Sequence, residues 1–205
     1  MTLPKDPKRV THSIHKSSLR RMGWGDPHPK TPLRAAWEWY CTTVSNDVMA
    51  ISLEAAIWLD DHARTLPAGA SVLDLGSGFS TWVLARHGLR VHTMDTDAVW
   101  LERTLQWLQR ESMAGLVTSQ VWAPGDPIPV GFAFASADMG ERRIRSIYYA
   151  DAFRAAPVVF VDDFNDRAVS CAAYKAAHQT GKRIQELGAE TRDGFGRFGA
   201  LAVDL

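Results

Sequence analysis

Short apolar segments alternate with helix-like segments through the middle of the chain, and this alternation restricts the fold more than any other feature. Strand-like segments lie at residues 71–75, 90–94, 116–122, 131–137 and 157–161. Segments with a helical spacing of apolar residues lie at residues 80–87, 98–110, 144–155 and 167–179. Alternating strands and helices are typical of a parallel sheet covered by helices on both faces. The sequence therefore predicts an α/β protein.

The last segment, residues 183–205, breaks this alternation. It predicts two strands around a turn at Asp193-Gly194-Phe195-Gly196. A tight turn joins its strands in antiparallel orientation. With this pair included, we expect a mostly parallel sheet of seven strands with a C-terminal antiparallel hairpin.

The region before the first strand differs from the rest in composition. Residues 1–33 hold five prolines and two glycines, and residues 1–34 carry eight Lys/Arg against two Asp, a net charge of +6 in a chain whose total is zero. We expect a basic, flexible N-terminal arm over residues 1–33, then one domain over residues 34–205 that starts with a helical cap at about residues 34–66. The arm either contacts phosphates or an acidic partner, or is a solvated tail.

The composition excludes several classes of protein. The hydrophobic share of 46% and the charged share of 22% are typical of a folded domain. No stretch reaches the roughly 18 apolar residues that a membrane helix needs, and the first residues do not resemble a secretion signal. We expect no membrane partner, a cytoplasmic location and two reduced thiols, Cys41 and Cys171, although one disulfide stays open.

Carboxylates follow the predicted strands where a ligand of a parallel sheet would lie. They are Asp74 at the first strand, Asp95 and Asp97 after the second, Asp138 after the fourth, and Asp162 and Asp163 after the fifth. Ligands of open parallel sheets bind at the carboxyl ends of the strands. The sequence therefore predicts a functional site at this edge.

The turn after the first strand contains Gly76, Ser77 and Gly78. Glycines permit a sharp turn and a close approach of the backbone to a ligand. Position 81 is Thr, so the G-x-G-x-x-G fingerprint of dinucleotide sites is incomplete. Asp95 can accept hydrogen bonds from both hydroxyls of a ribose. Its other possible role is to cap the next helix, but Asp97 is available for that role.

These segments resemble the motifs of one family. Residues 72–81 (VLDLGSGFST) are similar to the first motif of class I S-adenosylmethionine-dependent methyltransferases, and residues 91–97 (VHTMDTD) with Trp100-Leu101 resemble the second. Residues 134–138 (FASAD) and 158–163 (VVFVDD) resemble the fourth- and fifth-strand motifs of small O-methyltransferase-like members. The resemblance covers about residues 45–205 and implies a Rossmann-like, three-layer methyltransferase fold.

The resemblance also implies the residues that hold S-adenosylmethionine. Gly76, Ser77 and Gly78 would pass under its methionine part and ribose. Asp74 would orient the amino group, directly or through water, and Asp95 would hold the ribose hydroxyls, with Thr96 beside the adenine. The loop at residues 122–126 would contribute to the adenine pocket, and by analogy residues 45–52 would close over the cofactor.

Divalent-metal-dependent members of the family place one Asp after strand four and an Asp-Asn pair after strand five. Asp138, Asp162 and Asp163 occupy these places, with Asp163 in place of the amide. Oxygen ligands suit Mg²⁺ or another divalent cation such as Ca²⁺. On this interpretation Asp138 and Asp162 are also the candidate catalytic residues. The alternative is that Asp162 and Asp163 cap the following helix and pair with arginines among residues 142–145.

The expected activity is transfer of a methyl group from S-adenosylmethionine to a hydroxyl of a small molecule or sugar. Two alternatives stay open. One is a ribose methyltransferase guided to nucleic acid by the basic arm, and the other is an inactive subunit that only binds the cofactor. Four tryptophans lie before the first predicted strand: Trp24, Trp37, Trp39 and Trp58. Two interpretations of their role stay open: they pack a helical cap on the sheet, or they form an aromatic wall for a planar substrate.

Overall fold

The computed structural model of the 205-residue chain describes residues 31–45 and 50–205. Seven strands of this part form one sheet in the order β3-β2-β1-β4-β5-β7-β6. The strands are β1 (Ser71–Leu75), β2 (Arg90–Asp95), β3 (Val117–Val121), β4 (Phe134–Ala137), β5 (Val158–Val161), β6 (Lys182–Glu186) and β7 (Ala200–Asp204). Strands β1 to β5 are parallel, and β7 lies antiparallel between β5 and β6. The predicted fold class is confirmed.

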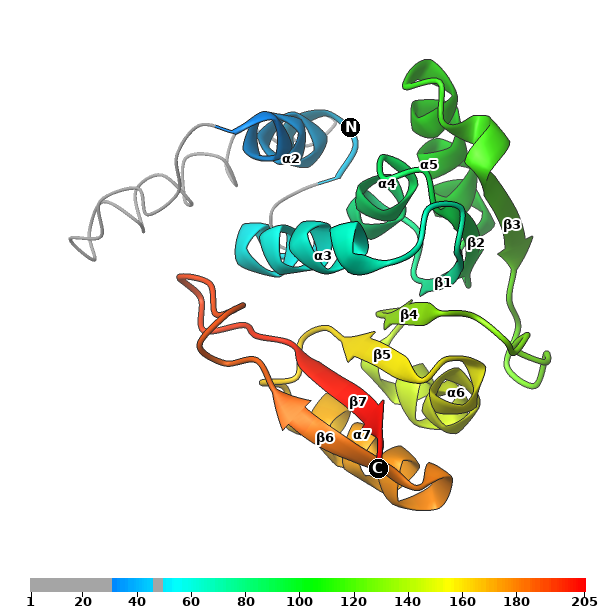
Figure 1. The fold of residues 1–205 in the computed structure, drawn as a ribbon, viewed down its shortest axis with the longest axis vertical. Coiled ribbons are helices and arrows are strands. Elements are labelled where there is room, and N and C mark those ends of the chain that lie inside the picture. The colour runs from blue at the N-terminus through cyan, green and yellow to red at the C-terminus, as the bar shows by residue number, and fades with distance from the viewer. Residues whose placement is uncertain (1–30, 46–49) are drawn as a thin grey trace, which may run out of the picture.

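Helices cover both faces of the sheet (Figure 1). The helices are α2 (Pro32–Thr43), α3 (Leu53–Thr65), α4 (Phe79–Ala85), α5 (Ala98–Arg110), α6 (Arg142–Ala155) and α7 (Arg167–Thr180), with a 3-10 turn, η1 (Ala114–Leu116). Helices α2 to α5 pack with Val72 and Phe160 on one face, and α6 and α7 pack with Leu73 and Val161 on the other. This division follows from the period of two in a strand, which sends neighbouring side chains to opposite faces.

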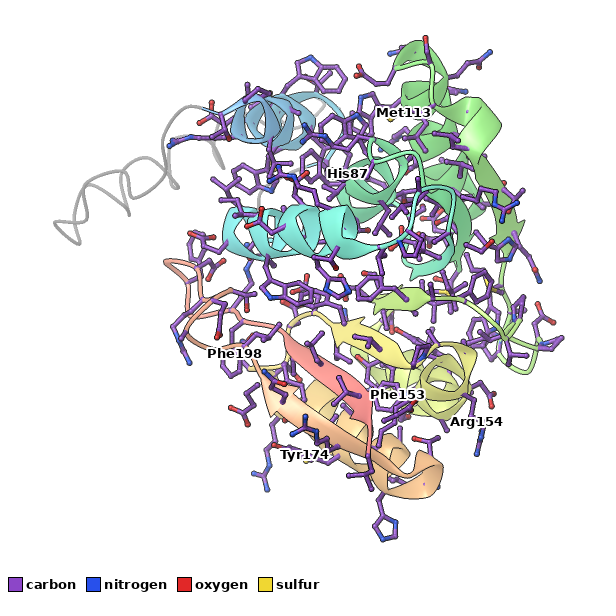
Figure 2. All side chains as sticks on the ribbon, in the orientation of Figure 1. His87, Met113, Phe153, Arg154, Tyr174 and Phe198 are labelled. Atoms are coloured by element: carbon purple, nitrogen blue, oxygen red, sulfur yellow. The ribbon has the colours of Figure 1, made fainter. Side chains whose placement is uncertain are left out.

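The helices begin and end at residues that suit these positions. Pro32 occupies the first turn of α2, and Asp97 caps α5 by accepting from the amides of Val99 and Trp100. Helix α7 starts after Asp166 and stops at Gly181, which has the left-handed φ of 71° that a side chain disfavours. On α6, Phe153 points into the core while its neighbour Arg154 points away from it (Figure 2).

Two predicted boundaries were wrong. Strand β4 begins at Phe134 rather than at residue 131, because residues 131–133 bend before they join the sheet. The strands β6 and β7 are not joined by a tight turn: residues 187–199 lie between them, and the predicted turn at residues 193–196 is only the tip of that connection. This longer connection carries a charged side chain to the carboxyl edge, as described below.

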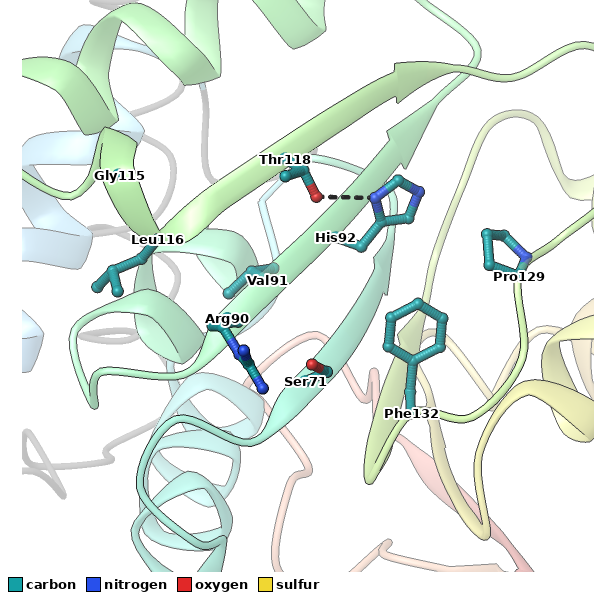
Figure 3. A pocket seen from close by; sticks show the side chains of 9 residues that line it. All are labelled: Ser71, Arg90, Val91, His92, Gly115, Leu116, Thr118, Pro129 and Phe132. Atoms are coloured by element: carbon teal, nitrogen blue, oxygen red, sulfur yellow. Dashed lines mark hydrogen bonds between the residues drawn. The ribbon is translucent and has the colours of Figure 1, made fainter.

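The connection from β3 to β4 leaves one part of the sheet uncovered. Residues 122–133, all of which the structure describes, contain turns and no helix. A hollow of about 400 Å³ lies here, lined by residues that begin the strands, such as Ser71 and Val91, and closed on one side by Phe132 (Figure 3). Within it, His92 pairs with the hydroxyl of Thr118 at 2.9 Å. This hollow lies at the edge opposite the carboxylates.

The tryptophans of the first helices contribute to packing. Trp58 of α3 stacks on Phe160 of β5 with ring centroids 5.2 Å apart, and the buried Trp37 donates to the carbonyl of Ile51 at 2.8 Å. Trp39 is 41% exposed. These contacts support the helical-cap interpretation over a substrate wall. Trp24 and residues 1–30 of the predicted arm (residues 1–33) lie outside the described residues, and Pro32 and Leu33 belong to α2.

Neither cysteine forms a disulfide. Cys41 is half-buried on α2 and Cys171 is exposed on α7. Among the described residues, we find no helix that combines the length and the apolarity required to cross a bilayer.

We predict that Gly199→Ala destabilises the fold. A Cβ atom at residue 199 would lie 2.5 Å from the ring of the buried Phe160, and such overpacking costs about 1–3 kcal/mol. Gly115→Ala is the matched control, because nothing lies within 4 Å of a Cβ atom there. Urea unfolding of both variants measures the effect. Equal unfolding midpoints would contradict the prediction.

Candidate functional site

The turn after β1 is built on a close backbone approach. Gly76 has a φ of 109°, and a Cβ atom there would lie 2.6 Å from the carbonyl oxygen of Asp138. The amide of Gly76 donates to the carbonyl of Met94 at 2.8 Å, and the amide of Asp138 donates to Leu75. Only glycine fits this geometry, which brings the ends of β1, β2 and β4 together.

Asp74 lies at the centre of this edge and is completely buried. Its Oδ2 atom accepts from the Thr81 hydroxyl at 2.5 Å and from the Ser80 hydroxyl at 3.2 Å. Its Oδ1 atom is buried without a hydrogen-bond partner among the described residues. Burial raises the pKa of Asp74 to about 7, against the opposite effect of the two hydroxyls. A buried carboxyl oxygen without a partner is costly, so this atom is suited to a ligand that donates a hydrogen bond.

Asp95, at the end of β2, holds the glycine turn. Its Oδ2 atom accepts from the amide of Ser77 at 2.8 Å and from the Ser77 hydroxyl at 2.9 Å, and its Oδ1 atom accepts from the amide of Asp97 at 3.0 Å. A carboxylate offers about four acceptor positions, so at least one is left for a ligand. The structure thus brings Asp74, Ser77 and Asp95 together as the sequence predicts.

Gly78 lies against a side chain that the sequence did not identify. A Cβ atom at Gly78 would lie 2.8 Å from the hydroxyl oxygen of Tyr40, which α2 places over the turn. Burial raises the pKa of Tyr40 above its ordinary value, and the charges of Asp74 and Asp95 add to this effect. Helix α2 therefore places the phenol group of Tyr40 against the glycine turn.

Thr96 and the loop after β3 lie beside this turn. The Thr96 hydroxyl lies 3.1 Å from where a Cβ atom at Gly140 would be, so the ends of β2 and β4 are in contact. Trp100 donates from Nε1 to the carbonyl of Ser77 at 2.6 Å. After β3, the buried Trp122 donates to the carbonyl of Asp126 at 3.0 Å and closes a turn. Of the predicted lid at residues 45–52, positions 46–49 lie outside the described residues.

The carboxylates after β4 and β5 lie beside two arginines. Arg145 of α6 forms an ion pair with Asp138, and its Nη2 atom lies 3.9 Å from Oδ2 of Asp163. Arg197, from the connection before β7, pairs with Asp193 at 2.7 Å and lies close enough to lower the pKa values of Asp138 and Asp162.

The carboxyls themselves differ in environment. Burial raises the pKa of Asp162 to about 8, with the charges of Asp138 and Asp163 adding to it, and Asp162 is only 6% exposed. Burial also raises the pKa of Asp138 to about 6, although Arg145 opposes this effect, and 32% of the side chain is exposed. Asp163 has a φ of 54°, a left-handed conformation that Asp tolerates better than most residues.

These residues do not fit a divalent cation. Among the side chains that the structure describes, no three carboxylate, imidazole or thiolate groups converge as metal ligands. The guanidinium of Arg145 pairs with Asp138 where the resemblance implied a cation. The alternative that Asp162 and Asp163 cap the next helix is also wrong, because Asp166 caps α7, but the predicted pairing with an arginine is confirmed for Arg145.

We predict that Asp74 makes the protein less stable as the pH rises. Its pKa is about 7 when folded and 3.8 in the unfolded reference, so its protonated form stabilises the fold below pH 4 and this contribution is lost as the pH rises through 7. Asp74→Asn should therefore flatten the fall in unfolding free energy between pH 5 and pH 8, as measured by urea unfolding. The exposed Asp151→Asn is the control and should behave like the wild type.

Comparison with known proteins gives a structural match without a sequence match. No protein-family model matches the sequence, and the search of curated proteins gives no match. Three solved structures illustrate the similarity. The O-methyltransferase TomG of Streptomyces achromogenes, in complex with S-adenosylmethionine, is 17% identical with a TM-score of 0.65 over 98% of this chain and 99% of its own.

An O-methyltransferase of Bacillus cereus in complex with S-adenosylhomocysteine is 16% identical, with a TM-score of 0.65 over 96% of this chain and 97% of its own. A methyltransferase of Podospora anserina bound to the same product is 11% identical, with a TM-score of 0.68 over 100% of this chain and 99% of its own. The sheet order, the antiparallel β7 and these similarities together show that the chain has the fold of class I S-adenosylmethionine-dependent methyltransferases.

Proposed function

We propose that this protein is an S-adenosylmethionine-dependent methyltransferase whose acceptor is a hydroxyl of a small molecule or sugar. The observation that carries the proposal is the buried Oδ1 atom of Asp74 beside the glycine turn, one strand away from Asp95; this atom has no hydrogen-bond partner within residues 31–45 and 50–205. The fold similarity to methyltransferases, two of them named O-methyltransferases, supports it.

The residues of this edge fit S-adenosylmethionine. Its amino group can donate a hydrogen bond to Oδ1 of Asp74, to which no group in the described part of the chain donates, and its ribose hydroxyls suit the acceptor position left on Asp95. The turn at Gly76–Gly78 presents backbone without side-chain bulk. Thr96 is the proposed neighbour of the adenine, with the turn at residues 122–126 as a further wall.

When bound, this cofactor supplies a methyl group on a positively charged sulfur. The protein's own contribution is to bring an acceptor oxygen in line and to exclude water, and no metal ion takes part in our proposal. Tyr40 and the buried hydroxyls of Ser80 and Thr81 close the inner side of the site.

Asp138 is the proposed general base. It follows β4 at the edge that holds Gly76, and its side chain is 32% exposed. Its pKa of about 6 leaves it mostly ionised at neutral pH and able to accept the proton of a hydroxyl. Asp162 is buried with a pKa of about 8, so we assign it a supporting role behind Asp138.

We predict that Asp95→Ala weakens binding of S-adenosylhomocysteine more than tenfold in calorimetric titration. The variant removes the proposed ribose acceptor. It also removes the acceptor of the Ser77 hydroxyl, so Ser77→Ala is a second variant that loses this hydroxyl bond, keeps the carboxylate and the amide bond to it, and should bind nearly as well as the wild type. Asp97→Asn, at the cap of α5, is the matched charge control. Unchanged affinity in Asp95→Ala would exclude the ribose assignment.

We predict that Asp138→Asn lowers methyl transfer to a hydroxyl acceptor about 100-fold, because a positioned base contributes factors of this order. Binding of S-adenosylhomocysteine should change less than threefold. In the wild type, the rate should rise with pH through about 6, as Asp138 loses its proton. Methyl transfer is measured with a labelled donor and a panel of phenols and sugars. Full activity of the variant would remove Asp138 from the mechanism.

If the protein binds S-adenosylhomocysteine but transfers no methyl group to any acceptor of the panel, a subunit that only binds the cofactor becomes the better interpretation. Salt-sensitive binding to RNA that disappears on deletion of residues 1–30 would instead favour a nucleic-acid acceptor.

A further inference from the structure

The carboxylates that follow β4 and β5 face a guanidinium group from the neighbouring helix. Arg145 pairs with Asp138, and its Nη2 atom lies 3.9 Å from a carboxylate oxygen of Asp163. Only 7% of the Arg145 side chain is exposed, whereas Asp138 and Asp163 are 32% and 25% exposed. The cation therefore lies below the carboxylates and not on the surface above them.

The position of Arg145 is fixed by the start of α6. The hydroxyl of Tyr148, one turn further along the helix, accepts from the amide of Met139 at 2.9 Å, which ties α6 to the residue directly after Asp138. The ring of Tyr148 contacts those of Trp122 and Tyr149 edge-on in the core. With the helix held in this way, the buried side chain of Arg145 lies beside Asp138.

Arg145 also satisfies a charge requirement. The charges of Asp138 and Asp163 raise the pKa of Asp162, and the charge of Asp163 raises the pKa of Asp138, so this cluster needs positive charge nearby. Arg145 supplies it from α6, and Arg197 adds a second guanidinium, held by Asp193. A divalent cation between the same carboxylates would be close to Arg145 and would be repelled by it.

We infer that Arg145 takes the place of a divalent cation in this chain, so that a permanent charge of the protein orders Asp138 and Asp163. A guanidinium is permanently charged and belongs to the chain, so it stays beside the carboxylates. The replacement of the cation by Arg145 does not rest on the proposed function.

The test is a Mn²⁺ titration of the full chain, followed by the electron paramagnetic resonance signal of free Mn²⁺. The wild type should bind no Mn²⁺ at this cluster. Arg145→Ala leaves the carboxylates without their counter-ion and free to converge on a cation, and it should create one Mn²⁺ site, at least tenfold tighter than any site of the wild type. Arg143→Ala removes the same charge from the exposed side of the same helix turn and should create none.

A second substitution locates the new site. Arg145→Ala combined with Asp162→Asn should lose the Mn²⁺ that Arg145→Ala gains. If Arg145→Ala does not fold, Arg145→Gln keeps a polar side chain without the charge and replaces it in the titration. The inference is overturned if the wild type binds one Mn²⁺ that Asp162→Asn abolishes, or if Arg145→Ala and Arg143→Ala bind Mn²⁺ equally.

Calorimetry with S-adenosylhomocysteine in excess chelator separates this inference from the proposed function. Binding to the wild type under these conditions agrees with both. Failure to bind, together with gain of Mn²⁺ by Arg145→Ala, would remove the proposed function and leave the replacement of the cation by Arg145 intact.

Discussion

The contact between the backbone of Gly76 and the carbonyl of Asp138 determines the shape of the carboxyl edge. Because no side chain stands between them, the turn after β1 can rest directly on the end of β4. The amide of Gly76 is bonded to Met94 of β2 at the same time. Three neighbouring strands thus end at one point, and Asp74, Asp95 and Asp138 meet there because of this contact.

Because Asp74, Asp95 and Asp138 lie close together, their negative charges repel one another. The protein stabilises each carboxyl group with different partners. Asp95 is stabilised by two amides and a hydroxyl, Asp138 by Arg145, and Asp74 by the hydroxyls of Ser80 and Thr81. Hydroxyls carry no charge, so the pKa of Asp74 stays raised. Near neutral pH, Asp138 is therefore mostly ionised, whereas Asp74 is about half protonated.

The strand and helix pattern could be predicted from the sequence because it depends on local periodicity and capping. The glycine turn, Asp74 and Asp95 could also be predicted, since parallel strands bring their carboxyl ends to one edge. Arg145 was only one of several candidate partners, because pairing across α6 and two strands depends on the rotation of the helix, which Tyr148 fixes. Tyr40 and Arg197 reach the site from segments distant in sequence, and no local motif marks them.

The predicted divalent cation at Asp138, Asp162 and Asp163 also could not be decided from the sequence. Three acidic residues at the ends of two strands are compatible with a cation or with a basic side chain, and the choice depends on what packs against them. That information lies in the tertiary structure. The roles of Asp138, Asp162 and Thr96 stay predictions for the experiments above.

The placement of β7 has a consequence for how the protein acquires its structure. Strand β6 joins the sheet only through β7, which follows it in the chain and inserts between it and β5. During synthesis, β1 to β6 leave the ribosome before the strand that completes their order. The nascent chain therefore exposes the edge of β5, and the sheet closes late through pairing of residues about 40 positions apart.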